Sequence, residues 1–475
     1  MHCEHASSTG QQAEKPSWID HEFSSIDLAD DRLNRRGRTI VSQIAQQPSA
    51  SIPQACQQWN ETKAAYRFLS NPRIAAAELL APHVEATLGR MQTHRTVLAV
   101  QDTTMLNYSR HPNTDGLGPV ANNPDKTLGF FLHTTFVVTP QGAPLGIINA
   151  DTHSRSAEQF GRSRRSMERN QKAVADKESQ RWVDSLKACQ RIAARCPNTQ
   201  IINIADREGD IYELFAQSLD EDCAAMVHLL IRVQHNRNVE ETSGRLWSHL
   251  EEQPPVATML VKVPRRAGQR ERIAKLVVRF CPVKVSAPLL KKDKPALALW
   301  AIQAREVESP HGVQPIVWRL LTTLSVANAG EAIERVGWYA QRWQIEMLHK
   351  VLKSGCKIES RQLESRAALE RLLMLDLIVA WRLMHLTKVG RYEPDDSAAL
   401  HVSDTEWKIL WWKFKSKEPL PSQPVSMRQI VRWIAQLGGF IGRKSDGDPG
   451  VITLWRGLQR LNDLSDAFST AQSCG

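Results

Sequence analysis

Two apolar stretches in the first half of the chain are nearly unbroken, and each stops at an acidic residue. The first runs from Thr96 to Gln101 and is followed by Asp102; the second runs from Thr199 to Ala205 and is followed by Asp206. Short runs of β-branched and apolar residues are typical of strands buried on both faces of a sheet. We therefore predict two buried strands, each with a carboxylate at its C-terminal end.

Further strand and helix patterns surround these two runs. Strands are expected at 128–139 and 143–150, joined as a hairpin by Pro140–Gly142, and at 225–233 and 316–326, with helices at 173–194 and 211–219 and a polar loop at 152–172. A segment rich in β-type runs, 236–315, is an insertion before the last of these strands. The order is three strands, helix, strand, helix, strand, insertion, and then a strand and a late helix, which indicates an α/β fold.

The late helix is predicted at Trp338–Lys353, which contains no Pro or Gly and spaces its apolar residues at helical intervals. At about 3.6 residues per turn, Tyr339, Arg342, Glu346 and Lys353 fall on one face within roughly 60° of arc. One interpretation is a solvated face, whose Arg342–Glu346 pair contributes about 0.2–0.5 kcal/mol. The other is a metal-binding carboxylate whose neighbouring cations neutralise phosphates, and this requires partner carboxylates elsewhere.

Helical patterns occupy both ends of the chain. In the first part, helices are expected at 25–47, at 52–69 with Pro53 in its first turn, and at 75–92. The second of them carries Lys63, Tyr66 and Arg67 along one side, which suits contacts with DNA phosphates or a groove, although a solvated face would look the same. After the late helix, patterns at 366–386, 427–437 and 451–464 predict a helical region that either contacts a second subunit or packs on its own core.

Length and composition limit the class of protein. A chain of 475 residues is expected to form about three domains. The net charge of +10 favours a polyanionic partner. The eight cysteines contain no C-x-x-C pair, which argues against a zinc site or a disulfide framework. Without an apolar run near 18 residues or a signal-peptide profile at the start, we expect a cytoplasmic protein that does not enter membranes.

Three acidic residues occupy positions that suit one catalytic centre. Adjacent strand ends would place Asp102 and Asp206 side by side, and the late helix would carry Glu346 over them. This arrangement is that of a ribonuclease-H-like core for nucleotidyl transfer. Three carboxylates suit two Mg²⁺ or Mn²⁺ ions about 3.5–4 Å apart, which activate the attacking oxygen and stabilise the leaving one.

The motifs around these acids resemble those of DDE insertion-sequence transposases of the insertion-sequence-four family. The residues Tyr339, Arg342, Glu346 and Lys353 match its Y-x2-R-x3-E-x6-K signature, and Asp102-Thr103-Thr104 resembles its first-acid motif. The run 206–210 is similar to its D-R-E-A-D second-acid motif and departs from it only at Gly209. Weaker likeness covers most of the chain, including 55–72, Lys177-Glu178-Ser179 and Gly438-Gly439-Phe440, and is least in the insertion, which the family has as a β-rich subdomain.

The resemblance implies a function and a set of site residues. A homodimer would bind double-stranded DNA at the terminal inverted repeats of a transposable element, cut it through a DNA hairpin, and join the freed ends to target DNA in the bacterial cytosol. Asp102, Asp206 and Glu346 would be catalytic metal ligands for two Mg²⁺ ions per site, with Mn²⁺ as a substitute. Tyr339, Arg342 and Lys353 would bind phosphate.

Other DNA-binding residues are weaker candidates. By resemblance, Trp318 would line a pocket for a flipped base, although a tryptophan in a strand is more often part of a core. Arg232 and Arg237 are candidates for DNA contact, with Gln234 and His235 beside them. The insertion adds a basic cluster that favours phosphate contact and salt-sensitive binding, with solvated hairpin tips as the alternative: Lys262, Arg265, Arg266, Arg270, Arg272, Lys275, Arg279, Lys291, Lys292 and Lys294.

The expected organisation is a helical DNA-binding domain at 1–75, a ribonuclease-H-like core at 76–365 with its β-rich insertion, and a helical, dimer-forming region at 366–475. Two other functions stay open: a regulator that occupies DNA ends without cutting them, and a ribonuclease-H-like nuclease or resolvase that never joins strands. Glu208 and Asp210 are expected to orient Arg207 or cap the next helix rather than to bind metal.

Overall fold

The computed structural model describes residues 18–121, 127–155, 179–223, 225–241, 244–263, 271–392, 394–395, 397–398, 401–443 and 446–473. Several expectations fall outside these ranges: most of the polar loop at 152–172, the first turn of the helix expected at 173–194, Lys177, Glu178, Arg265, Arg266 and Arg270. Among the described residues, no helix is both long and apolar enough to cross a membrane.

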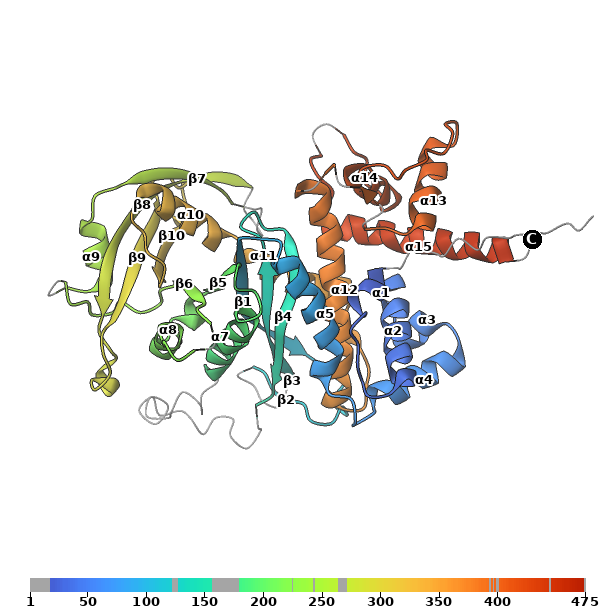
Figure 1. Cartoon of the computed structure of the whole chain (residues 1–475), viewed down its shortest axis with the longest axis horizontal. Coiled ribbons are helices and arrows are strands. Elements are labelled where there is room, and N and C mark those ends of the chain that lie inside the picture. The colour runs from blue at the N-terminus through green and yellow to red at the C-terminus, as the bar shows by residue number, and fades with distance from the viewer. Residues whose placement is uncertain are drawn as a thin grey trace, which may run out of the picture.

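One mixed sheet organises the described part of the chain (Figure 1). Its strand order is β2-β3-β1-β5-β6-β10-β9-β8-β7, with β4 paired to β3. The strands of the core are β1 (Thr96–Asn107), β2 (Gly118–Pro119), β3 (Leu128–Val138), β4 (Pro144–His153), β5 (Gln200–Ala205), β6 (His228–Arg232) and β10 (Val317–Thr322). The central strands β1, β5 and β6 are parallel, and the predicted hairpin is the antiparallel pair β3–β4.

The insertion extends this sheet. After helix α9 (Leu246–Glu252) come β7 (Ala257–Val263), β8 (Arg272–Val285) and β9 (Leu297–Glu306), which continue outward from β10 by antiparallel pairing. The segment is therefore β-rich, as its sequence predicts.

Helices cover both faces of the sheet, and the alternation of side chains along β1 assigns each face. Leu98 and Val100 belong to the core that α11 (Trp343–Lys350) and α12 (Arg366–Tyr392) also line. Val97 and Ala99 belong to the opposite core, with α7 (Gln180–Ala193) and α8 (Tyr212–Ser218). Helix α5 (Ala76–Met91) packs beside α12 and β4, and agrees with the helix predicted at 75–92.

Two groups of helices lie at the two ends of the chain. The N-terminal group is α1 (Trp18–Glu22), α2 (Asp31–Gln46), α3 (Ile52–Cys56) and α4 (Trp59–Leu69). The single helix expected at 52–69 is broken, because Gln57 has a φ of +60° and turns the chain between α3 and α4. The C-terminal group is α13 (Asp404–Lys415), α14 (Met427–Leu437) and α15 (Val451–Ser473). In Figure 1 both groups lie on the side of α12 that faces away from the sheet.

The single helix expected at Trp338–Lys353 is also wrong. The structure has α10 (Ala329–Ala340), a tight turn at Gln341–Arg342, α11, and a π-helical turn at Val351–Gly355. In the turn, the amide of Arg342 bonds the carbonyl of Tyr339, three residues back rather than four. No Pro or Gly marks this break, and the side chains on either side of it contact the sheet, Tyr339 at Trp318 and Arg342 at Asp102.

Candidate active site

Asp102 and Asp206 occupy equivalent positions on neighbouring strands. The parallel pairing of β1 with β5 ends at Val100 and Ile204, and each acid lies two residues beyond that last pair. The sequence predicts that strand β1 ends at Asp102. In the structure it continues to Asn107, because its antiparallel pairing with β3 extends that far. The two carboxylates therefore lie where the parallel part of the sheet opens.

Arg342 connects the late helix to this edge of the sheet. Its Nη1 lies 3.4 Å from Oδ2 of Asp102, and its Nη2 donates to the carboxylate of Glu346, four residues further along the chain. The side chains of Arg342 and Asp102 are 18% and 19% exposed, whereas Glu346 is 51% exposed. One guanidinium thus contacts two of the three acids expected to act together.

The electrostatics of Asp102 show that the three acids share one environment. Burial raises the pKa of Asp102 to about 7, the negative charges of Asp206 and Glu346 add to this effect, and Arg342 opposes it. The backbone amide of Thr103 also donates to Asp102 Oδ1 at 2.8 Å. A partly buried carboxyl group whose pKa is raised by burial and by neighbouring acids is a common feature of catalytic centres.

The donor set fits a hard divalent cation. Three carboxylates offer oxygen ligands, which Mg²⁺ and Mn²⁺ prefer. As placed in the described part of the chain, no three acidic, imidazole or thiol groups converge closely enough to hold an ion. The three carboxylates are therefore suitable ligands for a divalent cation. For all three to bind one ion, the exposed Glu346 side chain would have to move away from Arg342.

Tyr339 and Trp318 pack against each other beside the acids. Their rings meet edge to face, with centroids 5.3 Å apart and planes at 70°. Tyr339 is buried, and this burial raises the pKa of its phenol although Arg342 and Arg232 oppose the shift. The phenol is therefore a neutral hydrogen-bond donor at ordinary pH. Trp318 is half-buried, and part of its ring contacts Tyr339.

Lys353 does not contact Glu346. Its ammonium donates to the carbonyl of Met105 in β1 and lies 3.9 Å from Glu359. The π-helical turn carries Lys353 to a point three residues beyond Asp102 on the same strand. The structure therefore brings Tyr339, Arg342 and Glu346 together and places Lys353 further along the same strand edge.

Asp210 supports the loop that follows β6. Its buried carboxylate accepts from the backbone amides of Gln234 and His235, both at 2.8 Å, and binds the Arg237 guanidinium at 2.6 Å. The Arg237 side chain is only 11% exposed, so this pair, not DNA contact, accounts for its position. Glu208 instead binds Arg181 at 3.0 Å. These partners differ from the expected ones: Asp210 binds Arg237 and Glu208 binds Arg181, so neither contact orients Arg207, and helix α8 has no side-chain cap.

Gly209 is the one departure of the second-acid motif from its family pattern, and packing explains it. A Cβ at this position would lie 2.7 Å from the Cβ of Ala205 and 3.4 Å from the ring of Trp182. Contacts as short as the first are essentially never seen between real side chains, so glycine lets the turn after Asp206 pack closely on β5.

Two groups of predicted DNA-binding residues lie away from the acids. Lys63 and Arg67 are exposed on α4, next to Trp59, which is 75% exposed. In the insertion, several cluster members are engaged by acids: Lys262 with Glu271, Arg272 with Glu306, Lys275 with Glu308 and Lys291 with Glu213. The Glu306 side chain is fully buried, so Arg272 is structural. The cluster consequently presents less uncompensated charge than its sequence suggests.

Three family models match most of the chain, and residues 75–149, which include Asp102, lie outside all three matches. Residues 15–74 match the family model for transposase DNA-binding, residues 150–382 the transposase DDE domain, and residues 378–474 the transposase Tn5 dimerisation domain. A cryo-EM structure of a piggyBac transposase synaptic complex with hairpin DNA aligns over 94% of this chain and 81% of that chain, with 10% identity and a TM-score of 0.34. That likeness is too weak to support an argument.

The three family matches confirm the predicted fold class, a ribonuclease-H-like DDE core between an N-terminal DNA-binding domain and a C-terminal helical dimerisation domain. They also confirm that the chain is an enzyme of DNA transposition, of a class that generally depends on divalent metal. This chain belongs to the Tn5-like DDE transposases of the insertion-sequence-four family.

Proposed function

We propose that this transposase cuts and pastes DNA at the terminal inverted repeats of its element, in the bacterial cytosol, as a homodimer that uses two Mg²⁺ ions per site, with Mn²⁺ as a substitute. The observation that carries the proposal is the equal register of Asp102 and Asp206 beyond the last β1–β5 pair, with Arg342 joining Asp102 to Glu346. These carboxylates would hold the ions. The bound ions supply an activated nucleophile and stabilise the leaving oxygen of an in-line displacement.

The residues around the acids would orient the DNA strand. Arg342, once Glu346 turns to the metal, has a guanidinium free to form paired hydrogen bonds to a phosphate. Tyr339 is a neutral donor beside it, and Lys353 places a positive charge further along β1. A strand that follows this edge of the sheet would meet all three side chains in turn.

The remaining site residues have supporting roles in this proposal. Arg232 lies beside Tyr339 and would contact the same strand. Trp318 would contact an unpaired base at the hairpin with the part of its ring that Tyr339 leaves open. On α4, exposed Lys63 and Arg67 would bind the repeat sequence, separately from the catalytic edge. Arg237 changes role from DNA contact to support of the loop after β6.

The test uses purified full-length protein and DNA that carries the terminal repeats of the element, with and without Mg²⁺. Products are resolved on denaturing gels beside a Glu346→Gln control. We expect Mg²⁺-dependent nicks, then hairpins and joined strands, all absent from the control. Specific binding without any cleavage would instead indicate an end-binding regulator. Cleavage that never leads to hairpins or joined strands would indicate a nuclease or resolvase.

A further inference from the structure

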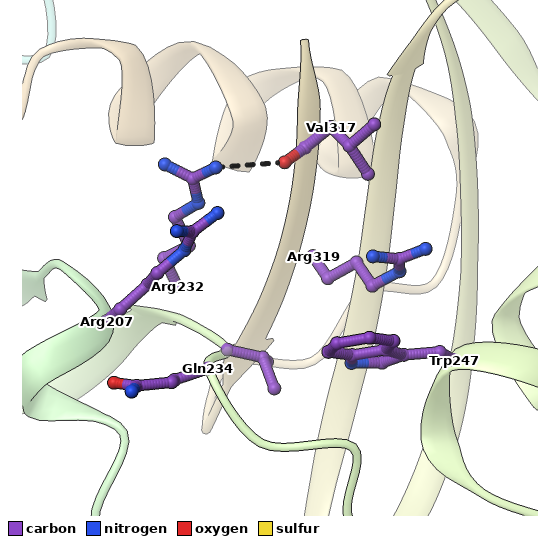
Figure 2. Close-up of a pocket in the computed structure, with 7 residues that line it drawn as sticks. Arg207, Arg232, Gln234, Trp247, Val317 and Arg319 are labelled. Carbon is purple, nitrogen blue, oxygen red and sulfur yellow. Dashed lines mark hydrogen bonds between the residues drawn. The ribbon is translucent and has the colours of Figure 1, made fainter. Parts of the chain in front are cut away.

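A cavity of about 290 Å³ lies next to the active site, between the end of β6, strand β10, helix α9 and the turn after Asp206 (Figure 2). Its lining residues are Arg207, Arg232, Val233, Gln234, Trp247, Val317 and Arg319. Its size is just below the lower end of the range for small-molecule pockets, about 300–1,000 Å³. The cavity could therefore accept one small group but not a DNA duplex.

Three arginines line the cavity, of which Arg319 is paired with Glu251, and Figure 2 shows the three on two opposite walls. Arg207 and Arg232 form one wall and Arg319 the other. Burial lowers the pKa of Arg232, and the charges of Arg207 and Arg342 lower it further. The arginines on this side of the site are thus crowded enough to repel one another, which an anion between them would relieve.

Contacts with other residues hold the guanidiniums of Arg232 and Arg319 in place. Arg232 donates to the carbonyl of Val317 at 3.1 Å. Arg319 lies over the ring of Trp247, 4.5 Å from its centroid, and donates to Glu251 at 2.9 Å. Such contacts lower the entropy that each side chain would lose on binding a ligand.

Two buried donors on the Arg319 wall lack a hydrogen-bond acceptor among the described residues. They are Nε of Arg319 and Nε1 of Trp247. Both groups can only donate, and buried donors are normally satisfied. Donors without acceptors on this wall favour an anionic ligand rich in acceptor oxygens over an apolar or cationic one.

The sequence connects this cavity to the catalytic edge. Arg207 directly follows Asp206, and Arg232 lies beside Tyr339. Because side chains alternate along a strand, Val317 and Arg319 point into the cavity, while Trp318 between them contacts Tyr339 on the other side of β10. Arg232, which pairs with Leu320 and lies beside Tyr339, connects the cavity to the Trp318 side of β10.

We propose that this cavity binds one phosphodiester group of the DNA strand held at the acids, a group other than the one cleaved. Arg207, Arg232 and Arg319 bind its oxygens, and Trp247 positions Arg319. This inference rests on the proposed function for the presence of a DNA strand at Asp206. It adds Arg207, Arg319 and Trp247 to the residues that fix the path of that strand.

The test compares Arg319→Gln with a matched control, Arg305→Gln. Both arginines contact Glu251, but only Arg319 lines the cavity. Binding to terminal-repeat DNA is measured without Mg²⁺ over a range of salt concentrations. We expect Arg319→Gln to weaken binding about tenfold and to make the slope of log K against log [salt] shallower by about 1. The control should keep the wild-type slope.

A second measurement identifies the phosphate. Single phosphates near the cleavage point are replaced by uncharged methylphosphonates, and affinity is measured for wild-type protein and for Arg319→Gln. At one position the substitution should weaken the wild type but not the variant. If Arg319→Gln lowers the affinity by the same factor on every substituted DNA, no single phosphate depends on Arg319. That result would overturn the proposal.

Two further outcomes separate this proposal from the proposed function. Arg207→Gln changes an exposed side chain, so it provides the same slope test if Arg319→Gln fails to fold. If the wild-type protein nicks its DNA ends but Arg319→Gln and Arg207→Gln both keep the wild-type salt dependence of binding, the phosphate site alone is refuted. If the variants show the expected shallower salt dependence but the wild-type protein never nicks DNA with Mg²⁺, the phosphate site stands and the proposed cleavage is refuted.

Discussion

The guanidinium of Arg342 lies 3.4 Å from the carboxylate of Asp102, although the two residues are 240 positions apart in the chain. The same guanidinium also binds Glu346. A partly buried cation that contacts both acids offsets their mutual repulsion. It also competes for the carboxylate oxygens that a divalent ion would use.

This competition predicts opposite effects of Arg342→Gln on metal binding and on catalysis. Removing the cation should increase the affinity of the DNA-free protein for Mn²⁺, measured by electron paramagnetic resonance. The nicking rate should fall by about tenfold or more, because the strand loses a charge-assisted phosphate contact worth about 1.5–3 kcal/mol. If metal affinity and nicking both fell, Arg342 would be a support for the metal site rather than a competitor.

A buried acid near the N-terminus predicts how stability depends on pH. Burial alone would raise the pKa of Glu22, but His83 and Arg90 outweigh it and lower the pKa to about 2. Nε2 of His83 accepts from the amide of Ile147 at 2.9 Å, so Nδ1 carries the proton that it donates to Glu22. The charged Glu22 thus stabilises the fold above about pH 4.5, and this contribution is lost as the pH falls towards 2.

The expected loss is on the order of 3 kcal/mol, and Glu22→Gln should remove it. The measurement is the free energy of unfolding in urea at several pH values between 7 and 2.5. Glu85→Gln is the control, since Glu85 also pairs with an arginine but is 43% exposed. Equal pH dependence in the wild type and in Glu22→Gln would show that Glu22 is not the group responsible.

A buried ion pair attaches the N-terminal helices to α12. Arg361 binds Asp376 at 2.9 Å, with side chains 3% and 0% exposed, and donates to the carbonyls of Pro48 and Ala50. Arg361→Leu should reduce the free energy of unfolding by about 3–5 kcal/mol, because it leaves a buried carboxylate without a partner. Arg391→Gln, which breaks a more exposed pair, should change it by less than about 1 kcal/mol. Similar losses in both variants would contradict this account.

The sequence predicted the central strands well because their signals are local. Apolar runs that end at Asp102 and Asp206 give both strands, and a spacing of three to four residues gives the contact of Arg342 with Glu346. The pairing register that aligns the two acids cannot be read from either run alone. It depends on which residues meet across the β1–β5 ladder.

Features set by distant contacts were missed. The break at Gln341–Arg342 has no Pro or Gly to signal it, and the contacts on either side of it, Tyr339 with Trp318 and Arg342 with Asp102, join residues far apart in the chain. Arg237 looked like a free cation because its partner, Asp210, lies 27 residues away. The cavity combines residues from four separate segments, and only Arg232 and Gln234 among its polar lining had been singled out as candidates.

The central claim is that Asp102, Asp206 and Glu346 form one metal-dependent catalytic centre. The most direct measurement is the Mg²⁺-dependent nicking rate of Asp102→Asn, Asp206→Asn and Glu346→Gln, with Glu208→Gln as a control acid bound to Arg181. Each of the three should lose about a hundredfold or more in rate while still binding the terminal repeats, and Glu208→Gln should stay near the wild type. Wild-type nicking by any one of the three variants would contradict the account.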